Sequence, residues 1–221
     1  MSIQHHLDDA TIMRYASGDL DEAFAIVVAS HIAMCAECRR AVRLAEAVGG
    51  VELLEGGQSQ LDESAFDRLM RRVDSAPDSM IDPKPPMKVT DLETGDVPLP
   101  LSRHVGRAYT DIRWRRVVPG IQRCRIELPS TESSLYMLRI NPGLKMPEHG
   151  HGGEEMTLIL KGAYRDEVGR FAAGDIADLD HHVEHQPRVD SPEPCICLIA
   201  TETKARFKGR IGRLLQPLIG I

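Results

Sequence analysis

Aromatic residues are scarce in this chain of 221 residues, at 4% of the total. Its hydrophobic core must therefore rely on aliphatic side chains and methionine, within a hydrophobic content of 42% that is typical of globular proteins. No stretch reaches the ~20 apolar residues of a membrane-spanning helix. The first residues show no basic segment followed by an apolar one. We therefore expect no signal peptide, no membrane association and a cytoplasmic location.

Cysteines are also few, with five in the chain. Without a recognisable export signal, such a small number argues against a disulfide framework and favours metal or redox chemistry. The length is more than one small domain needs and predicts two domains.

The negative charge lies entirely in the N-terminal part of the chain. Residues 1–88 hold 9 Lys and Arg against 15 Asp and Glu, and the remaining residues hold equal numbers of each sign. An acidic domain does not bind nucleic acid by neutralising phosphates, so we expect no direct contact with nucleic acid. A basic protein is a suitable partner, although a solvated acidic surface explains the same charge.

The first third of the sequence has the apolar spacing of four helices. We expect them over residues 10–18, from residue 22 onward after Asp21, over 37–48 with Gly49-Gly50 as the end, and over 62–73. The last of these places an apolar stripe on one face, which consists of Phe66, Leu69, Met70 and Val73. This stripe either packs inside the helical domain or forms a contact surface for a partner.

The composition changes after residue 74. Proline, aspartate and serine dominate the next segment, which predicts a linker over residues 76–97. Short apolar or alternating runs then follow, broken by Gly and Pro, as in an all-β sandwich or barrel. The predicted fold is a multi-domain α plus β protein, with a helical domain at residues 1–75 and a β-domain at residues 98–221.

The segment HIAMCAEC, residues 31–38, carries the first candidate metal site. On a helix, His31 and Cys35 share one face, and Cys38 follows about one turn later. Zinc prefers four such ligands in a tetrahedron, and His5 or His6 is the nearest source of the fourth. A redox dithiol would need a βαβ context, which is absent here. Two buried cysteines beside a core histidine are the remaining alternative.

A second candidate metal site lies at residues 148–155, EHGHGGEE. His149 and His151 face the same side of a strand, and the Gly152-Gly153 bend can return Glu155 to them. His185 supplies a fourth ligand. For His181 and His182 we expect a place on the surface or hydrogen bonds to the ligands, rather than binding of the metal itself. Three imidazoles and one carboxylate suit zinc, manganese or iron and can leave coordination positions open.

The second site resembles the cupin family. The first cupin motif, G-x5-H-x-H-x3-E-x6-G, is complete from Gly143 to Gly162. The second motif, G-x5-P-x-G-x2-H-x3-N, matches at Gly174 and His185. It departs at three other positions, which hold Asp180, His182 and Val189. The resemblance therefore implies a C-terminal cupin barrel.

The order of the two sites resembles the ChrR-type zinc-dependent anti-sigma factors of bacteria. The likeness covers nearly the whole chain, including HHLDDATIMRYASG, LDEAFAIVVASH, GAYRDEVGRFAAGDI and CICLIAT. It implies that the N-terminal domain sequesters an extracytoplasmic-function sigma factor, and that the cupin responds to singlet oxygen or organic hydroperoxides. By this resemblance the zinc ligands are His6, His31, Cys35 and Cys38, and the ligands of the cupin metal are His149, His151, Glu155 and His185.

Two alternatives concern the cupin domain. A dioxygenase-like metalloenzyme is one, but no catalytic residue stands out beyond the metal ligands, although Glu154, Tyr164 and Asp178 are available. The other concerns Cys195 and Cys197, which face one side of a predicted strand and either respond to oxidation or simply pack there. Cupins often dimerise through their sheets, so a homodimer through this domain is a further prediction.

Overall fold

The computed structural model describes residues 2–57, 61–76, 95–129, 131–150, 152–179, 184–203 and 206–207. These residues form two compact units, one from residues 1–46 with 95–221 and the other from residues 47–94. Most of the predicted linker, residues 77–94, lies outside the described residues. The predicted boundaries at residues 75 and 98 separate domains that are expected to fold independently, and they stay a prediction.

The first two helices begin at aspartates, as the sequence predicts. Helix α1 (Asp9–Ser17) follows Asp8, whose side chain accepts a hydrogen bond from the Thr11 amide at 2.6 Å. Helix α2 (Glu22–Met34) follows Asp21, which caps the amide of Ala23 in the same way. Such caps satisfy amide donors that have no partner within the helix. Gly18 ends α1 in the left-handed conformation, with φ 76°.

The end predicted for the third helix is wrong. Helix α3 (Ala36–Glu55) continues through Gly49 and Gly50. A helical glycine costs only about 1 kcal/mol relative to alanine, and the segment VELLE that follows has good helix formers. Helix α4 (Ala65–Asp74) begins three residues later and ends one residue later than the predicted range of 62–73. A short helix α5 (Leu99–Val105) precedes the strands.

The C-terminal part is an antiparallel β-structure, as predicted. Its largest sheet has the order β1-β2-β3-β11-β5-β8, and two three-stranded sheets have the orders β10-β6-β7 and β12-β4-β9. The strands are β1 (Arg115–Val118), β2 (Ile121–Ile126), β3 (Ser134–Ile140), β4 (His149–Gly150), β5 (Glu155–Lys161), β6 (Ala163–Arg165), β7 (Arg170–Ala172), β8 (Ile176–Leu179), β9 (Glu184–His185), β10 (Arg188–Val189), β11 (Cys195–Thr201) and β12 (Arg206–Phe207).

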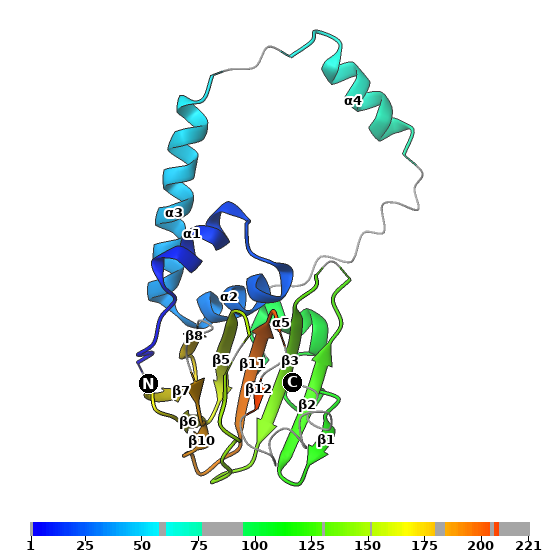
Figure 1. Cartoon of the computed structure of the whole chain (residues 1–221). Coiled ribbons are helices and arrows are strands. Elements are labelled where there is room, and N and C mark those ends of the chain that lie inside the picture. The colour runs from blue at the N-terminus through cyan, green and yellow to red at the C-terminus, as the bar shows by residue number, and fades with distance from the viewer. Residues whose placement is uncertain are drawn as a thin grey trace. The chain divides into compact units, whose positions relative to one another are not determined.

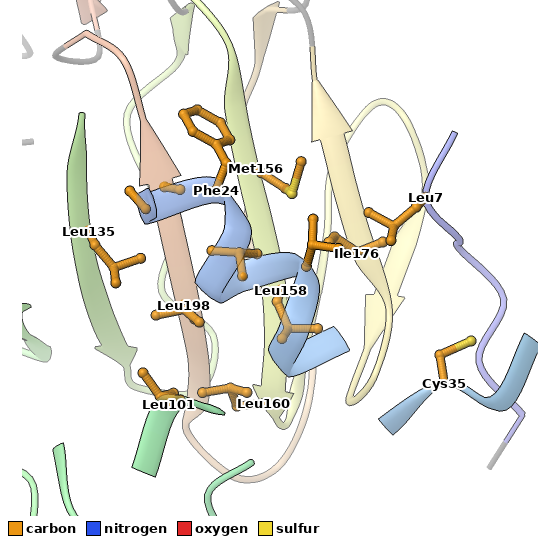
Figure 2. Close-up of a cluster of buried hydrophobic side chains, with 14 of the residues drawn as sticks. Leu7, Phe24, Cys35, Leu101, Leu135, Met156, Leu158, Leu160, Ile176 and Leu198 are labelled. Carbon is orange, nitrogen blue, oxygen red and sulfur yellow. The ribbon is translucent and has the colours of Figure 1, made fainter. Parts of the chain in front are cut away.

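The central strands β5 and β11 of the six-stranded sheet are buried on both faces. In β11 the side chains alternate between two hydrophobic clusters, so Leu198 lies in one and Cys197 in the other. This explains why the strand is apolar throughout. Helix α2 covers one face, where Phe24 packs with Leu158 and other sheet residues (Figure 2). The helices of residues 1–46 and the cupin sheet therefore share one core.

In the part of the chain that the structure describes, no helix combines the length and the apolar character that crossing a bilayer requires.

Candidate metal centres

The first predicted cluster is assembled as expected. His6 lies in the extended segment before α1, His31 in the last turn of α2, Cys35 between α2 and α3, and Cys38 in the first turn of α3. One ligand atom from each lies within 4.8 Å of all the others. The Nδ1 atom of His6 is 3.4 Å from Cys35 Sγ and 3.5 Å from Cys38 Sγ. His6, rather than His5, therefore joins the cluster.

The ring of His31 is oriented for a metal. Its Nδ1 atom lies 3.0 Å from the carbonyl oxygen of Gly174, so this nitrogen carries the proton and donates it. Its Nε2 atom is buried and has no hydrogen-bond partner in the described part of the structure. Burial lowers the pKa of His31 to about 4, so the ring is neutral at physiological pH. A buried lone pair without a donor is what a metal ion would satisfy.

The two cysteines complete a donor set that fits zinc. All five cysteines of the chain are free thiols, and Cys35 and Cys38 are both buried. Burial raises the pKa of Cys38 to about 11, so an ion must displace the proton when it binds. Two sulfur and two nitrogen donors within one small volume match the tetrahedral preference of zinc. The cluster can therefore hold a metal ion of this type.

The second predicted cluster comes from three strands. His149 on β4 and His185 on β9 are directly paired, and their ring centroids are 4.6 Å apart. Glu155 begins β5, and the three ligand atoms lie within 4.8 Å of one another. All three residues are buried. The other residues predicted here, His151, Asp180, His181 and His182, lie outside the described residues.

Hydrogen bonds orient both imidazoles of this cluster. The Nδ1 atom of His149 lies 2.8 Å from the carbonyl oxygen of Pro147, and that of His185 lies 2.8 Å from Asp166 Oδ2. With the proton on Nδ1, the Nε2 atom of each ring is the nitrogen that could bind an ion. Burial opposes the charge of Asp166, but hydrogen bonds from His185 and Gly169 outweigh it and lower the pKa of this carboxyl. Sequence reasoning missed Asp166, whose one signal is its place in the turn RDEVG.

An apolar cavity adjoins this cluster inside the barrel. Its lining includes the three candidate ligands together with Tyr136, Leu138, Ile140, Met146, Thr157, Tyr164, Pro187, Val189, Cys195, Cys197 and Ile199. The hydroxyl of Tyr164 is buried and has no hydrogen-bond partner among the described residues. Cys195 and Cys197 both face this cavity, as the alternation of the strand predicts. The lining thus combines the polar groups of the candidate ligands and Tyr164 with mostly apolar side chains.

The remaining predicted residues lie elsewhere. Glu154 pairs with Arg14 at 2.9 Å, and Asp178 accepts a hydrogen bond from Thr11 at 2.8 Å, so both join the cupin to α1. The stripe on α4 is exposed, and no side chain of this helix is buried. The exposed fractions are 69% for Phe66, 55% for Leu69, 40% for Met70 and 55% for Val73.

Known proteins resemble the chain over its whole length. A family model described as the ChrR cupin-like domain matches residues 102–205. The sequence is 38% identical over 226 residues to the anti-sigma-E factor ChrR of Cereibacter sphaeroides, and the match covers 100% of both proteins. The crystal structure of Rhodobacter sphaeroides SigE in complex with the anti-sigma ChrR is similar with a TM-score of 0.75 and 38% identity, over 90% of this chain and 99% of that chain. The chain therefore belongs to the ChrR family of anti-sigma factors, which are regulators rather than enzymes.

Proposed function

We propose that this protein sequesters an extracytoplasmic-function sigma factor through its N-terminal helices and releases it when the cupin domain meets an oxidant. The observation that carries the proposal is the full-length likeness to a chain whose crystal structure contains a sigma factor. Membership of the family supports the anti-sigma role in general. The particular sigma factor and the oxidants are the finer part of the proposal.

Zinc is the proposed ion of the first cluster. His6, His31, Cys35 and Cys38 are its proposed ligands. The Nε2 atom of His31, which has no hydrogen-bond partner within the described ranges, supports this assignment. A bound ion would tie the N-terminal segment to the junction of α2 and α3. The helices that face the sigma factor would then be fixed in one arrangement, because structural zinc contributes on the order of 10 kcal/mol to small domains.

The exposed stripe on α4 is the proposed contact with the sigma factor. Its members are Phe66, Leu69, Met70 and Val73, and they form one apolar face of a helix that is otherwise charged. Such a face suits a hydrophobic groove on a partner. The acidic charge of residues 1–88 would favour a basic partner and oppose DNA. We also propose a cytoplasmic location, which a partnership with a sigma factor would require because transcription occurs there.

The cupin is the proposed sensor. His149, Glu155 and His185, with His151 as the fourth ligand, would hold zinc, manganese or iron. The apolar cavity next to these residues suits the body of an organic hydroperoxide. The hydroxyl of Tyr164, which has no hydrogen-bond partner among the residues that the structure describes, can donate to an oxygen of such a molecule. Singlet oxygen is the second proposed inducer. Cys195 and Cys197 line the same cavity, and we assign the trigger to the metal centre rather than to these thiols.

A homodimer through the cupin domain would need a surface other than the sheet face that α2 covers. The buried contacts of Phe24, Val27 and Val28 already occupy that face.

The test of the proposed function uses the full chain. Metal content by mass spectrometry is combined with a pull-down of the sigma factor encoded nearest the gene. We expect zinc in the native chain and sigma binding that a chelator abolishes. A chain that holds no metal at the cysteines and retains no sigma factor would contradict the proposal.

A further inference from the structure

The turn between β7 and β8 of the cupin, residues 173–175, lies against the N-terminal segment that carries His6. Figure 1 shows this segment passing the strands β7 and β8. Two backbone amides of the segment donate to the carboxylate of Asp175: Gln4 N lies 2.6 Å and His5 N 3.1 Å from its Oδ1 atom. Asp175 is only 2% exposed. One buried carboxylate thus fixes the backbone immediately before a predicted zinc ligand.

The same carboxylate also closes its own turn. Its Oδ2 atom accepts a hydrogen bond from the amide of Ala172 at 2.8 Å. Both carboxylate oxygens are therefore occupied by backbone donors, one on the cupin and the other on the N-terminal segment. Burial opposes the charge of Asp175, but these amide donors and His5 outweigh it and lower the pKa of the carboxyl. The side chain at residue 175 must therefore accept hydrogen bonds at both of its terminal atoms.

The neighbouring residue reaches a second predicted ligand. The carbonyl oxygen of Gly174 accepts the Nδ1 proton of His31, which fixes the direction of the Nε2 lone pair. Gly174 has φ +95°, and a Cβ atom there would lie 2.7 Å from Ile3 Cγ1. Glycine is suited to this position because it adopts the left-handed region and lets the N-terminal segment approach closely.

The turn therefore contacts one histidine ligand, His31, directly, and it holds the two backbone amides that precede the other, His6. We propose that Asp175 and Gly174 are positioning residues for the first metal site, so that the affinity of this site for zinc depends on a turn of the cupin domain. The inference rests on the proposed zinc site. In this arrangement the cupin positions the two imidazole ligands, whereas the junction of α2 and α3 positions the two thiol ligands.

The decisive substitution is Asp175→Asn, which conserves volume. The asparagine side chain has one acceptor oxygen and one NH2 group, which cannot accept a hydrogen bond. The NH2 group would face at least one backbone amide that now donates to Asp175, so that hydrogen bond would be lost. The matched control is Glu154→Gln. This substitution removes the ion pair with Arg14, which is another contact between α1 and the cupin. It leaves unchanged the hydrogen bonds of residues 173–175 with His31 and with the backbone before His6.

Cobalt(II) titration of the full chain reports on the first site through a sulfur-to-cobalt charge-transfer band, because cysteines are among the proposed ligands of this site and not among those proposed for the cupin metal. Zinc affinity follows from competition with a chromophoric chelator. Substituting residues that orient metal ligands usually lowers metal affinity about 10–100-fold. We expect a loss in this range and an altered band for Asp175→Asn, and less than twofold change for Glu154→Gln.

Three outcomes would overturn the inference in different ways. A folded Asp175→Asn chain with native affinity and a native band would remove the positioning role and leave the zinc site standing. An equal loss in Glu154→Gln would assign the effect to general docking of α1. A native chain without any charge-transfer band would overturn the zinc site itself, and the inference with it. Circular dichroism on both variants verifies that each is folded before titration.

Discussion

The carboxylate of Asp166 and the imidazole of His185 form a buried pair, with Oδ2 and Nδ1 2.8 Å apart and side-chain exposures of 1% and 4%. The pair fixes the proton on Nδ1 and presents Nε2 to the other cupin ligands. We expect Asp166→Asn to lower the metal affinity of the cupin about 10–100-fold. Isothermal titration with zinc, manganese and iron(II) measures this. Asp190→Asn, which removes an acceptor from Arg170 on the same barrel, is the control.

Replacing either cysteine of the proposed zinc site should destroy the anti-sigma activity. Cys35→Ser or Cys38→Ser removes a thiolate, so the first site should lose its ion and the N-terminal helices a stabilisation on the order of 10 kcal/mol. The target promoter should then be active without inducer. Metal content and a reporter gene measure the two effects. Cys124→Ser, at a half-buried thiol outside both centres, should leave both unchanged.

Replacing the cupin ligands should separate sensing from repression. In His149→Ala and Glu155→Ala we expect the sigma factor to stay bound, because the first cluster is intact, while induction by hydroperoxide or singlet oxygen falls. The same result is expected for His151→Ala. Reporter activity with and without the inducer measures both properties. Constitutive activity in these variants would show that the cupin metal is needed for repression as well.

The α4 stripe should contribute to sigma binding without contributing to the fold. Phe66→Asp and Leu69→Asp place a charge on an exposed apolar face, so the melting temperature should hardly change. Buried anchors at interfaces are often worth about 2 kcal/mol or more, which corresponds to at least a tenfold weaker complex. Biolayer interferometry with the sigma factor measures this. Val168→Asp, an equally exposed apolar site on the β6–β7 turn, should bind normally.

The thiols in the cupin cavity should be dispensable for induction. A hydrogen bond with Cys195, together with burial, raises the pKa of Cys197 well above its ordinary value, so this sulfur stays a poorly reactive thiol at neutral pH. The double variant Cys195→Ser, Cys197→Ser should therefore respond to inducers like the native chain, provided that its melting curve shows it to be folded. Loss of induction in a folded double variant would establish a thiol trigger instead.

Local chemistry made much of this structure predictable from sequence. The helix starts after Asp8 and Asp21 follow from side-chain caps. His31, Cys35 and Cys38 come together because they are close in sequence, where the last turn of α2 meets the first turn of α3. The proposed cupin ligands rest on a motif in which strand alternation fixes the side-chain direction. In each case the interacting residues are close in sequence, or the resemblance supplied their pairing.

Long-range contacts were not predictable in the same way. Nothing about Asp166 or Asp175 distinguishes either from an ordinary turn aspartate, because their partners lie 19 and about 170 residues away in the chain. The pair Gly49-Gly50 predicts a helix end, but the free-energy cost of a glycine in a helix is too small to end α3 there. The packing of α2 on the sheet was equally invisible, because apolar periodicity identifies a buried face without identifying what covers it.

The shared core between α2 and the sheet has a practical consequence for handling this protein. A truncated chain that begins near residue 95 would present Leu135, Leu158, Leu198 and their neighbours to solvent, since Phe24, Val27 and Val28 would no longer cover them. Such an exposed apolar face favours aggregation or artificial self-association. The isolated cupin is therefore a poor reagent for assigning an oligomeric state, and soluble expression should improve when residues 1–46 are retained.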